Sequence, residues 1–326
     1  MKKKEKKNST HPTSLGGLSL GKKIVRQRQL LYMTVPFIIW AFIFSYLPLA
    51  GWVMAFQDFK LKRSLSESFF TAPFVGFKHF ELLFQDLADK GRFFLALRNT
   101  LAMSLLALVF GFVIPVIFAI FLNEIRLRSF KRVVQTISYL PHFISWVVAA
   151  GMISVMLSSE GPINNLLVSL GWVEQRVAFL AEPKLFWGII TISDIWKEMG
   201  WNAIIFLAAI TGVDMSLYES AAIDGAGRFR RIWHVTLPSI APVIMVVLIM
   251  EVGWIISIGF EKQYLLGSDL VRNYSEVLDV YVLRYGIGQS RYSFGTAIGM
   301  FKSIISVILV LVVNRVVKFT GQDTIL

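Results

Sequence analysis

Three long stretches of this chain carry no charged residue: Gln29 to Gln57, Asn99 to Asn123 and Val133 to Ser159. A helix needs about 20 apolar residues to cross the roughly 30 Å hydrocarbon core of a bilayer. Each stretch is long enough, and none shows the short alternating segments of an outer-membrane β-barrel. Only 17% of the 326 residues are charged, against about 25% in a typical soluble domain. The pattern therefore predicts an all-α integral membrane protein.

Three further apolar stretches raise the expected number of spans to six. The six are expected at about 30–57, 99–123, 133–158, 186–212, 238–260 and 292–314. The first is too long for the apolar region of a secretory signal and has no small-residue cleavage site, so we interpret it as an uncleaved span. It follows a basic tail, residues 1–28, which contains nine Lys or Arg. The membrane domain is expected to cover residues 29–320.

The distribution of positive charge predicts the orientation. With the N-terminus inside, the short cytoplasmic segments hold eighteen Lys or Arg, and the longer external loops hold twelve. Because cytoplasmic loops carry the excess of positive residues, both termini are expected in the cytoplasm of a multi-pass protein of the cell membrane. The segment 214–238, between the fourth and fifth spans, is then also cytoplasmic.

This segment is polar and rich in small residues. Ser216 and Glu219 fit a capping box at a helix start, and Gly225 and Gly227 allow the chain to turn. A second short helix is expected before Pro238, and its apolar face consists of Phe229, Ile232 and Trp233. A helix–turn–helix with so little side-chain bulk lets the backbone of another protein approach closely. It is typical of docking rather than of catalysis.

The segment resembles the signature loop of permease subunits in binding-protein-dependent ABC importers. That loop has E-A-A, three residues, Gly, nine residues, then I-x-L-P. Here Glu219–Ala221 is followed by Gly225 and by Val235–Pro238 with every spacing kept, although Ser220 replaces the first Ala and Val235 the Ile. Other stretches, such as FLNEIRLRSFKRVVQTISYLPHFISWVV from Phe121, are similar to the oligosaccharide and polysaccharide branch of sugar importers. The likeness covers about residues 30–320.

The resemblance implies a six-transmembrane-helix ABC importer permease fold with a cytoplasmic helix–turn–helix coupling loop. It implies half of a translocation pore for oligosaccharides or polysaccharide fragments. The implied partners are a second homologous permease in a heterodimer, a dimeric ABC ATPase and an extracytoplasmic sugar-binding protein. The ATPase would dock on Glu219, Ser220, Ala221, Ala222, Asp224, Gly225, Ala226, Arg228 and Phe229. No cofactor is expected in this chain, since the partner ATPase would bind ATP and Mg.

Charged residues within spans are candidates for function because their burial in lipid is costly. The candidate substrate path consists of Trp196, Lys197, Trp201, Asn202, Glu251, Trp254 and Lys302. Two interpretations stay open. Either these groups line a polar cavity, or the charges neutralise one another, for example among Asp194, Lys197 and Glu198, which lie at i, i+3 and i+4. Glu251 is a lone carboxylate in its span, and Lys197 and Lys302 are its candidate partners.

Other classes of function find less support. The chain has no G-x-x-x-x-G-K-[ST] loop to bind ATP phosphates, no cysteine, and four histidines without metal-ligand spacing. We therefore expect no catalytic residue and no metal. The alternative is a membrane-embedded glycosyl or acyl transferase, which would need a carboxylate or His cluster at the membrane surface. An ion channel or secondary carrier would not need the coupling loop.

Overall fold

The computed structural model describes residues 28–88 and 90–319, so the basic tail up to residue 27 lies outside the described residues. The chain divides into two compact units, Met1–Val53 and Met54–Leu326. In the first unit, α2 (Arg28–Ala41) continues through a π turn, η2 (Phe42–Tyr46), into the 3₁₀ segment η3 (Leu47–Phe56), whose last residues belong to the second unit.

The second unit is helical. Its longer helices are α4 (Lys78–Ala88), α5 (Arg92–Leu106), α6 (Val113–Glu124), α7 (Arg128–Tyr139), α8 (Trp146–Met156), α10 (Phe186–Thr211), α13 (Leu237–Trp254) and α17 (Tyr292–Phe319). Shorter helices are α3 (Leu65–Thr71), α9 (Pro162–Ser169), α11 (Met215–Ile223), α12 (Arg228–Arg231), α14 (Glu261–Leu266), α15 (Arg272–Ser275) and α16 (Leu278–Tyr281). Helical turns of other types are η4 (Ala107–Phe112), η5 (Leu140–Phe143), η6 (Phe179–Ala181), η7 (Pro183–Leu185), η8 (Ile232–Thr236), η9 (Asp269–Val271) and η10 (Val282–Ile287). Among the described residues, the only β pairing is an isolated bridge between Gln57 and Phe74.

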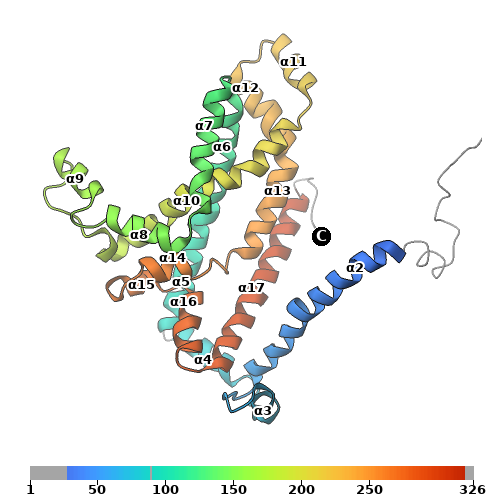
Figure 1. The fold of residues 1–326 in the computed structure, drawn as a ribbon, viewed down its shortest axis with the longest axis vertical. Helices are drawn as coiled ribbons and strands as arrows, with labels where there is room; N and C mark the ends of the chain where they lie inside the picture. Colours follow the sequence, from blue (N-terminus) through green and yellow to red (C-terminus); the bar gives the residue numbers. More distant parts are fainter. Residues whose placement is uncertain (1–27, 89, 320–326) are drawn as a thin grey trace, which may run out of the picture. The chain divides into compact units, whose positions relative to one another are not determined.

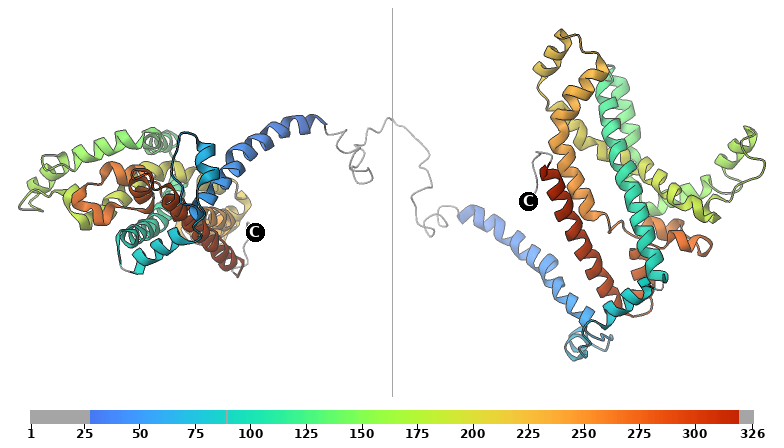
Figure 2. Two further views of the ribbon diagram at one scale, coloured as in Figure 1. Left: turned by 90° about the horizontal axis from the view of Figure 1, so that it is seen from below. Right: turned by 180° about the vertical axis from the view of Figure 1, so that it is seen from behind.

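The helices of this unit place two groups of segments at opposite ends. Figure 1 shows α13 and α17 side by side, with α6 and α7 running next to each other. The helices α11 and α12 lie at one end of this bundle, and α4 and α16 lie at the other, as the view from behind also shows (Figure 2). The α8–α9 segment projects away from the long helices.

Four helical stretches are long and apolar enough to cross a membrane on their own. They are Arg28–Phe56, Arg92–Glu124, Arg228–Trp254 and Tyr292–Lys318. Two bent pairs meet the same criteria jointly: Arg128–Phe143 with Trp146–Met156, bent by 105°, and Pro183–Thr211 with Met215–Ile223, bent by 70°. By length and composition, the described residues thus hold four spans, or up to six if each bent pair is one span. The predicted count of six stays a prediction.

In two of the predicted spans, the helix is interrupted or ends early. At 133–158 the chain bends after Pro141, because Ile144 is extended and Ser145 begins a new helix as its cap. The predicted span 238–260 was too long at its end, since α13 stops at Trp254. There the carbonyl of Ile255 accepts a hydrogen bond from the Ser104 hydroxyl instead of continuing the helix.

The segment 214–238 also differs from its predicted outline. The cap of α11 is Asp214, whose carboxylate accepts from the Ser216 backbone N–H at 2.9 Å, so Ser216 is not the cap. This hydrogen bond holds the pKa of the Asp214 carboxyl below its usual range. The expected second short helix is not separate either. A π turn, η8, joins α12 to α13 in one continuous helix, and it ends at Thr236, two residues before Pro238.

Three apolar clusters hold the long helices together. One packs α4, α5, α16 and α17 around Phe93 and Ile298, and another packs α5, α8 and α10 around Phe186. The third packs α6, α10 and α13 around Phe206 and Ile240. Within a bilayer such clusters hold helices together mainly through van der Waals packing, because lipid tails are as apolar as the side chains. The clusters therefore fix α10 and α13, the two helices that carry most of the candidate site.

Candidate functional site

Two adjoining cavities lie where α10, α13 and η4 meet the start of α14. The first, here called the acidic recess, is lined by Ala107, Gly111, Phe112, Pro115, Asp194, Ile195, Glu198, Met199, Asn202, Glu251 and Lys262. The second, here called the Trp254 recess, is lined by Ser104, Ala107, Leu108, Glu251, Trp254, Ile255, Ser257, Ile258 and Lys262. Their volumes are about 170 and 200 Å³. Glu251 and Lys262 line both.

Lys262 pairs with Asp194 across this site. The Lys262 Nζ lies 2.5 Å from the Asp194 Oδ2, and each side chain is only 16% exposed. The break after α13 makes this contact possible, because it turns the chain so that α14 brings Lys262 to α10. The ammonium also lies 5.7 Å from the ring centroid of Trp146, within the range of a cation–π contact.

A second polar cluster lies beside the first on α10. The Lys197 Nζ contacts the Glu198 Oε1 at 3.0 Å and donates to the carbonyl of His142 at 2.8 Å. The Glu198 Oε2 lies 2.6 Å from the His142 Nδ1. The His142 ring stacks on Trp201 with centroids 4.2 Å apart and planes 1° from parallel. The bend after α7 delivers His142 to this face of α10.

Glu251 stands apart from both clusters. Among the described residues, it forms no ion pair and no side-chain hydrogen bond. The predicted pairing of Glu251 with Lys197 or Lys302 is wrong: Lys197 contacts Glu198, and Lys302 contacts Asp279. The open interpretation that the charges neutralise one another holds in part: Lys197 pairs with its neighbour Glu198, but Asp194 pairs with Lys262 and not with a residue of its own helix.

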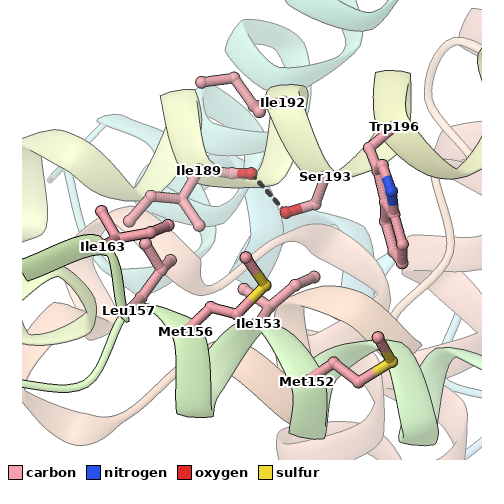
Figure 3. Close-up of a pocket in the computed structure, with 9 residues that line it drawn as sticks. All are labelled: Met152, Ile153, Met156, Leu157, Ile163, Ile189, Ile192, Ser193 and Trp196. Carbon is pink, nitrogen blue, oxygen red and sulfur yellow. Dashed lines mark hydrogen bonds between the residues drawn. The ribbon is translucent and has the colours of Figure 1, made fainter. Parts of the chain in front are cut away.

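The structure brings only part of the predicted substrate path together. Asn202, Glu251 and Trp254 line the two recesses, and Lys197 and Trp201 belong to the neighbouring polar cluster. Trp196 instead lines an apolar groove between α8, α9 and α10 (Figure 3). Lys302 lies on α17 and pairs with α16.

Two site residues escaped the sequence reasoning: His142 and Lys262. Lys262 is the second residue after the predicted end of the fifth span. A charged residue just after the end of an apolar stretch is a weak signal of function, because charged residues also follow the ends of ordinary membrane spans. His142 follows Pro141, and proline is a residue that bends helices, but the contact with Glu198 depends on the angle of the bend.

The predicted docking residues lie together at the α11–α12 end of the bundle (Figure 1). Glu219, Ser220, Ala222, Asp224, Gly225, Arg228 and Phe229 are exposed, and Ala221 and Ala226 are half-buried. Gly225 has φ +72°, in the left-handed region that favours glycine. The large apolar side chains of Ile223 and Phe229 are 87% and 80% exposed. An exposed apolar patch of this kind is typical of an interaction surface.

The described residues contain no group of three or more His, Asp or Glu side chains arranged to hold a metal ion. In the acidic recess, the Asp194 carboxylate pairs with the Lys262 ammonium instead. Carboxylates and an indole that line a cavity can accept hydrogen bonds from hydroxyl groups and contact apolar C–H faces. The arrangement therefore suits binding of a polar organic molecule.

Comparisons with known proteins identify the family. The family of binding-protein-dependent transport system inner membrane components matches residues 111–324. The chain is 41% identical over 304 residues to the polygalacturonan/rhamnogalacturonan transport system permease protein YteP of Bacillus subtilis (strain 168), covering 93% of this chain and 92% of YteP. It is 38% identical over 320 residues to the protein LplB of the same organism, covering 98% of both chains.

Two solved structures are also similar along nearly the whole chain. One is the crystal structure of a bacterial ABC transporter involved in the import of the acidic polysaccharide alginate, with 40% identity, a TM-score of 0.81, and coverage of 91% of this chain and 97% of that one. The other shows the alginate transporter in complex with an alginate pentasaccharide-bound periplasmic protein, with 38% identity, a TM-score of 0.83 and coverage of 94% and 99%. The chain therefore belongs to the family of binding-protein-dependent transport system inner membrane components and is a permease subunit, not an enzyme.

Proposed function

We propose that this chain forms half of the translocation pathway of an ATP-driven importer for acidic oligosaccharides, and that a second, homologous permease supplies the other half. The observation that carries this proposal is the exposed polar face of α13. Glu251 and Trp254 lie about one turn apart on this helix, and both are exposed in the single subunit. Charged side chains within membrane helices are costly, and they face the interior of a helix bundle or a water-filled cavity in nearly every case. Such a face must therefore border water or another protein.

The size of the recesses supports a shared pathway. Ligand pockets usually enclose about 300–1,000 Å³, whereas the two recesses measure about 170 and 200 Å³. A second subunit facing α13 would enclose the space in front of Glu251 and Trp254. The two recesses would then become one wall of a larger cavity.

The substrates of similar proteins suggest the class of substrate. One similar structure is that of a transporter involved in the import of alginate, an acidic polysaccharide, and YteP is named for polygalacturonan and rhamnogalacturonan. The acidic recess holds three carboxylates and one ammonium, so its excess negative charge repels a uronate carboxylate. We assign the contacts with sugar hydroxyls and C–H faces to this subunit, and the contacts with uronate carboxylates to the second permease.

The segment 214–238 is proposed as the docking site of the ATPase. Its support is the exposure of Ile223 and Phe229 next to the turn at Gly225. Because α12 continues into α13 without a break, movement of this segment reaches Glu251 through one helix. The ATPase binds ATP and Mg, and a sugar-binding protein delivers the substrate at the opposite end. The excess of Lys and Arg supports cytoplasmic termini.

The test is ATP-dependent uptake into proteoliposomes that contain the chain, the second permease and the ATPase. A radiolabelled trigalacturonate and a neutral trisaccharide are presented with the sugar-binding protein. We expect uptake of the acidic sugar only with ATP, and we expect Glu251→Gln and Trp254→Ala to change its rate or the preference between the sugars. Assembly with the partner subunits should survive in both variants.

The matched control is Met250→Leu, since Met250 is exposed on the same helix but lines neither recess. It should transport as the wild type does, because the change conserves volume. If Glu251→Gln and Trp254→Ala both keep the wild-type rates and sugar preference, the translocation pathway lies on another face of the subunit. Equal uptake without ATP would reject the importer itself.

A further inference from the structure

A further cavity lies between the α6–α7 connection and the docking segment. It measures about 380 Å³ and is lined by Asn123, Glu124, Arg126, Met215, Tyr218, Arg228 and Arg231. We call it the arginine recess. Its lining comes from two separate parts of the chain, the end of α6 and the segment from α11 to α12. Three guanidinium groups thus border one cavity.

The charges of the arginine recess are not balanced within the described part of the chain. The Arg228 Nε pairs with the Glu124 Oε2 at 2.9 Å, which uses the one carboxylate of the lining. Arg126 and Arg231 form no ion pair and no side-chain hydrogen bond with any residue that the structure describes. Like charges around one cavity repel each other. An anion bound between them would remove that repulsion.

The donors of the lining indicate which anion fits. Arginine presents a planar fork of N–H groups that binds phosphate in bidentate fashion. The Asn123 side-chain amide adds a further donor. The Tyr218 hydroxyl is already held by the Thr236 Oγ1 at 3.0 Å, so it shapes the wall. A phosphate matches this set better than a sugar, whose hydroxyls would leave the positive charges uncompensated.

The place of the recess indicates the source of the phosphate. The helix α6 belongs to the span Arg92–Glu124, so Glu124 is the last residue of a membrane-crossing helix. Trp233, in the turn after α12, is 69% exposed, and Trp is enriched at the membrane–water boundary. Basic pockets between helix ends on the cytoplasmic side bind anionic lipid head groups. We propose that the arginine recess binds the phosphate of an anionic phospholipid, an inference that takes its cytoplasmic location from the proposed function.

The experiment uses the whole importer in nanodiscs that contain phosphatidylcholine with or without phosphatidylglycerol. Native mass spectrometry counts the phosphatidylglycerol retained after release from the nanodisc. A double variant, Arg126→Gln with Arg231→Gln, removes both unpaired charges. Each arginine near an anionic lipid contributes a factor of about five in affinity, so we expect about a 25-fold loss. The matched control is Arg230→Gln, because Arg230 is exposed on the same short helix but does not line the recess.

The expected result is retention of phosphatidylglycerol by the wild type and by the control, and its loss from the double variant. Restored retention in Arg126→Lys with Arg231→Lys would support a role of the charge rather than of the fold. Equal loss in Arg230→Gln, or no loss in the double variant, would overturn the proposal. Two further outcomes would overturn it. One is that the wild type in plain phosphatidylcholine binds inorganic phosphate with the same affinity as it binds phosphatidylglycerol. The other is that the double variant in plain phosphatidylcholine fails to bind the ATPase. Lipid retention is read without transport, so its failure is separate from failure of the proposed function.

Discussion

At the scale of single residues, the charged side chains within the last three spans each have an oppositely charged partner, with one exception. Asp194 pairs with Lys262, Lys197 with Glu198, and Lys302 with Asp279. Glu251 has no such partner among the described residues. Pairing lowers the cost of placing ions in a membrane. The paired residues therefore stabilise the subunit, whereas the exposed Glu251 is available to a substrate or to a partner.

The Lys262–Asp194 pair gives the first prediction. Lys262→Gln leaves a carboxylate with 16% exposure without its counter-charge, and breaking a buried pair costs about 3–5 kcal/mol. We expect a clearly lower apparent Tm in nanodiscs, followed by tryptophan fluorescence. Lys262→Gln combined with Asp194→Asn removes both charges and should recover most of the loss.

The control for this prediction is Lys60→Gln. It removes the ion pair with Asp58, whose charged atoms lie 3.5 Å apart and whose side chains are largely exposed. Surface pairs contribute about 0–1 kcal/mol, so its Tm should stay near that of the wild type. A Tm of Lys262→Gln equal to that of Lys60→Gln would show that the Asp194 carboxylate is hydrated or protonated instead of being paired.

Gly225 gives the second prediction. An added Cβ would meet no atom within 4 Å at Gly225 or at Gly227, but Gly225 has φ +72° and Gly227 has φ −68°. Alanine in the left-handed region costs about 1–2 kcal/mol. We expect Gly225→Ala to weaken binding of the ATPase by about ten-fold and Gly227→Ala to leave it unchanged, as measured by titration of the purified ATPase. If Gly225→Ala and Gly227→Ala bind the ATPase with equal affinity, docking does not depend on the left-handed backbone conformation of Gly225.

At the scale of elements, the sequence predicted where apolar segments lie better than how they bend. The length and the charge content of the apolar stretches predicted where α10 and α17 lie, because both properties can be read from the sequence of each stretch alone. The 105° bend after Pro141 and the end of α13 at Trp254 depend on tertiary contacts, such as the hydrogen bond from Ser104 to the Ile255 carbonyl. Lys262 and His142 reach the site only through these breaks. The lining of the recesses could therefore be predicted only in part.

The contact between α7 and α10 gives the third prediction. A Cβ at Gly200 would overlap the backbone of Ser138, so no side chain fits there. Gly200→Ala should push the two helices apart and lower the yield of folded protein, at a cost of about 1–3 kcal/mol. The measurement is the monodisperse fraction in size-exclusion chromatography after heating. Gly188→Ala, on the same helix with nothing within 4 Å of an added Cβ, should behave as the wild type, and equal losses in both would point to a general intolerance of α10.

At the scale of the whole subunit, the docking segment and the binding-protein side are expected at opposite ends of the bundle. The helices α11 and α12 lie at one end of α13, and α4 and α16 lie at the other end of α17 (Figures 1 and 2). The separation suits a subunit that meets an ATPase on one side of the membrane and a binding protein on the other. The charge count along the sequence favours the same orientation.

The last prediction tests this orientation with introduced thiols, since the chain has no cysteine of its own. Asp269, in η9, and Ile223, at the end of α11, are both exposed. A membrane-impermeant maleimide added to intact cells should label Asp269→Cys and should label Ile223→Cys only after the membrane is opened. A thiol-directed crosslinker should capture the sugar-binding protein from Asp269→Cys and the ATPase from Ile223→Cys. The reverse pattern would invert the topology, and it would also place the arginine recess outside the cell, where neither the docking assignment nor the proposed cytoplasmic lipid site could hold.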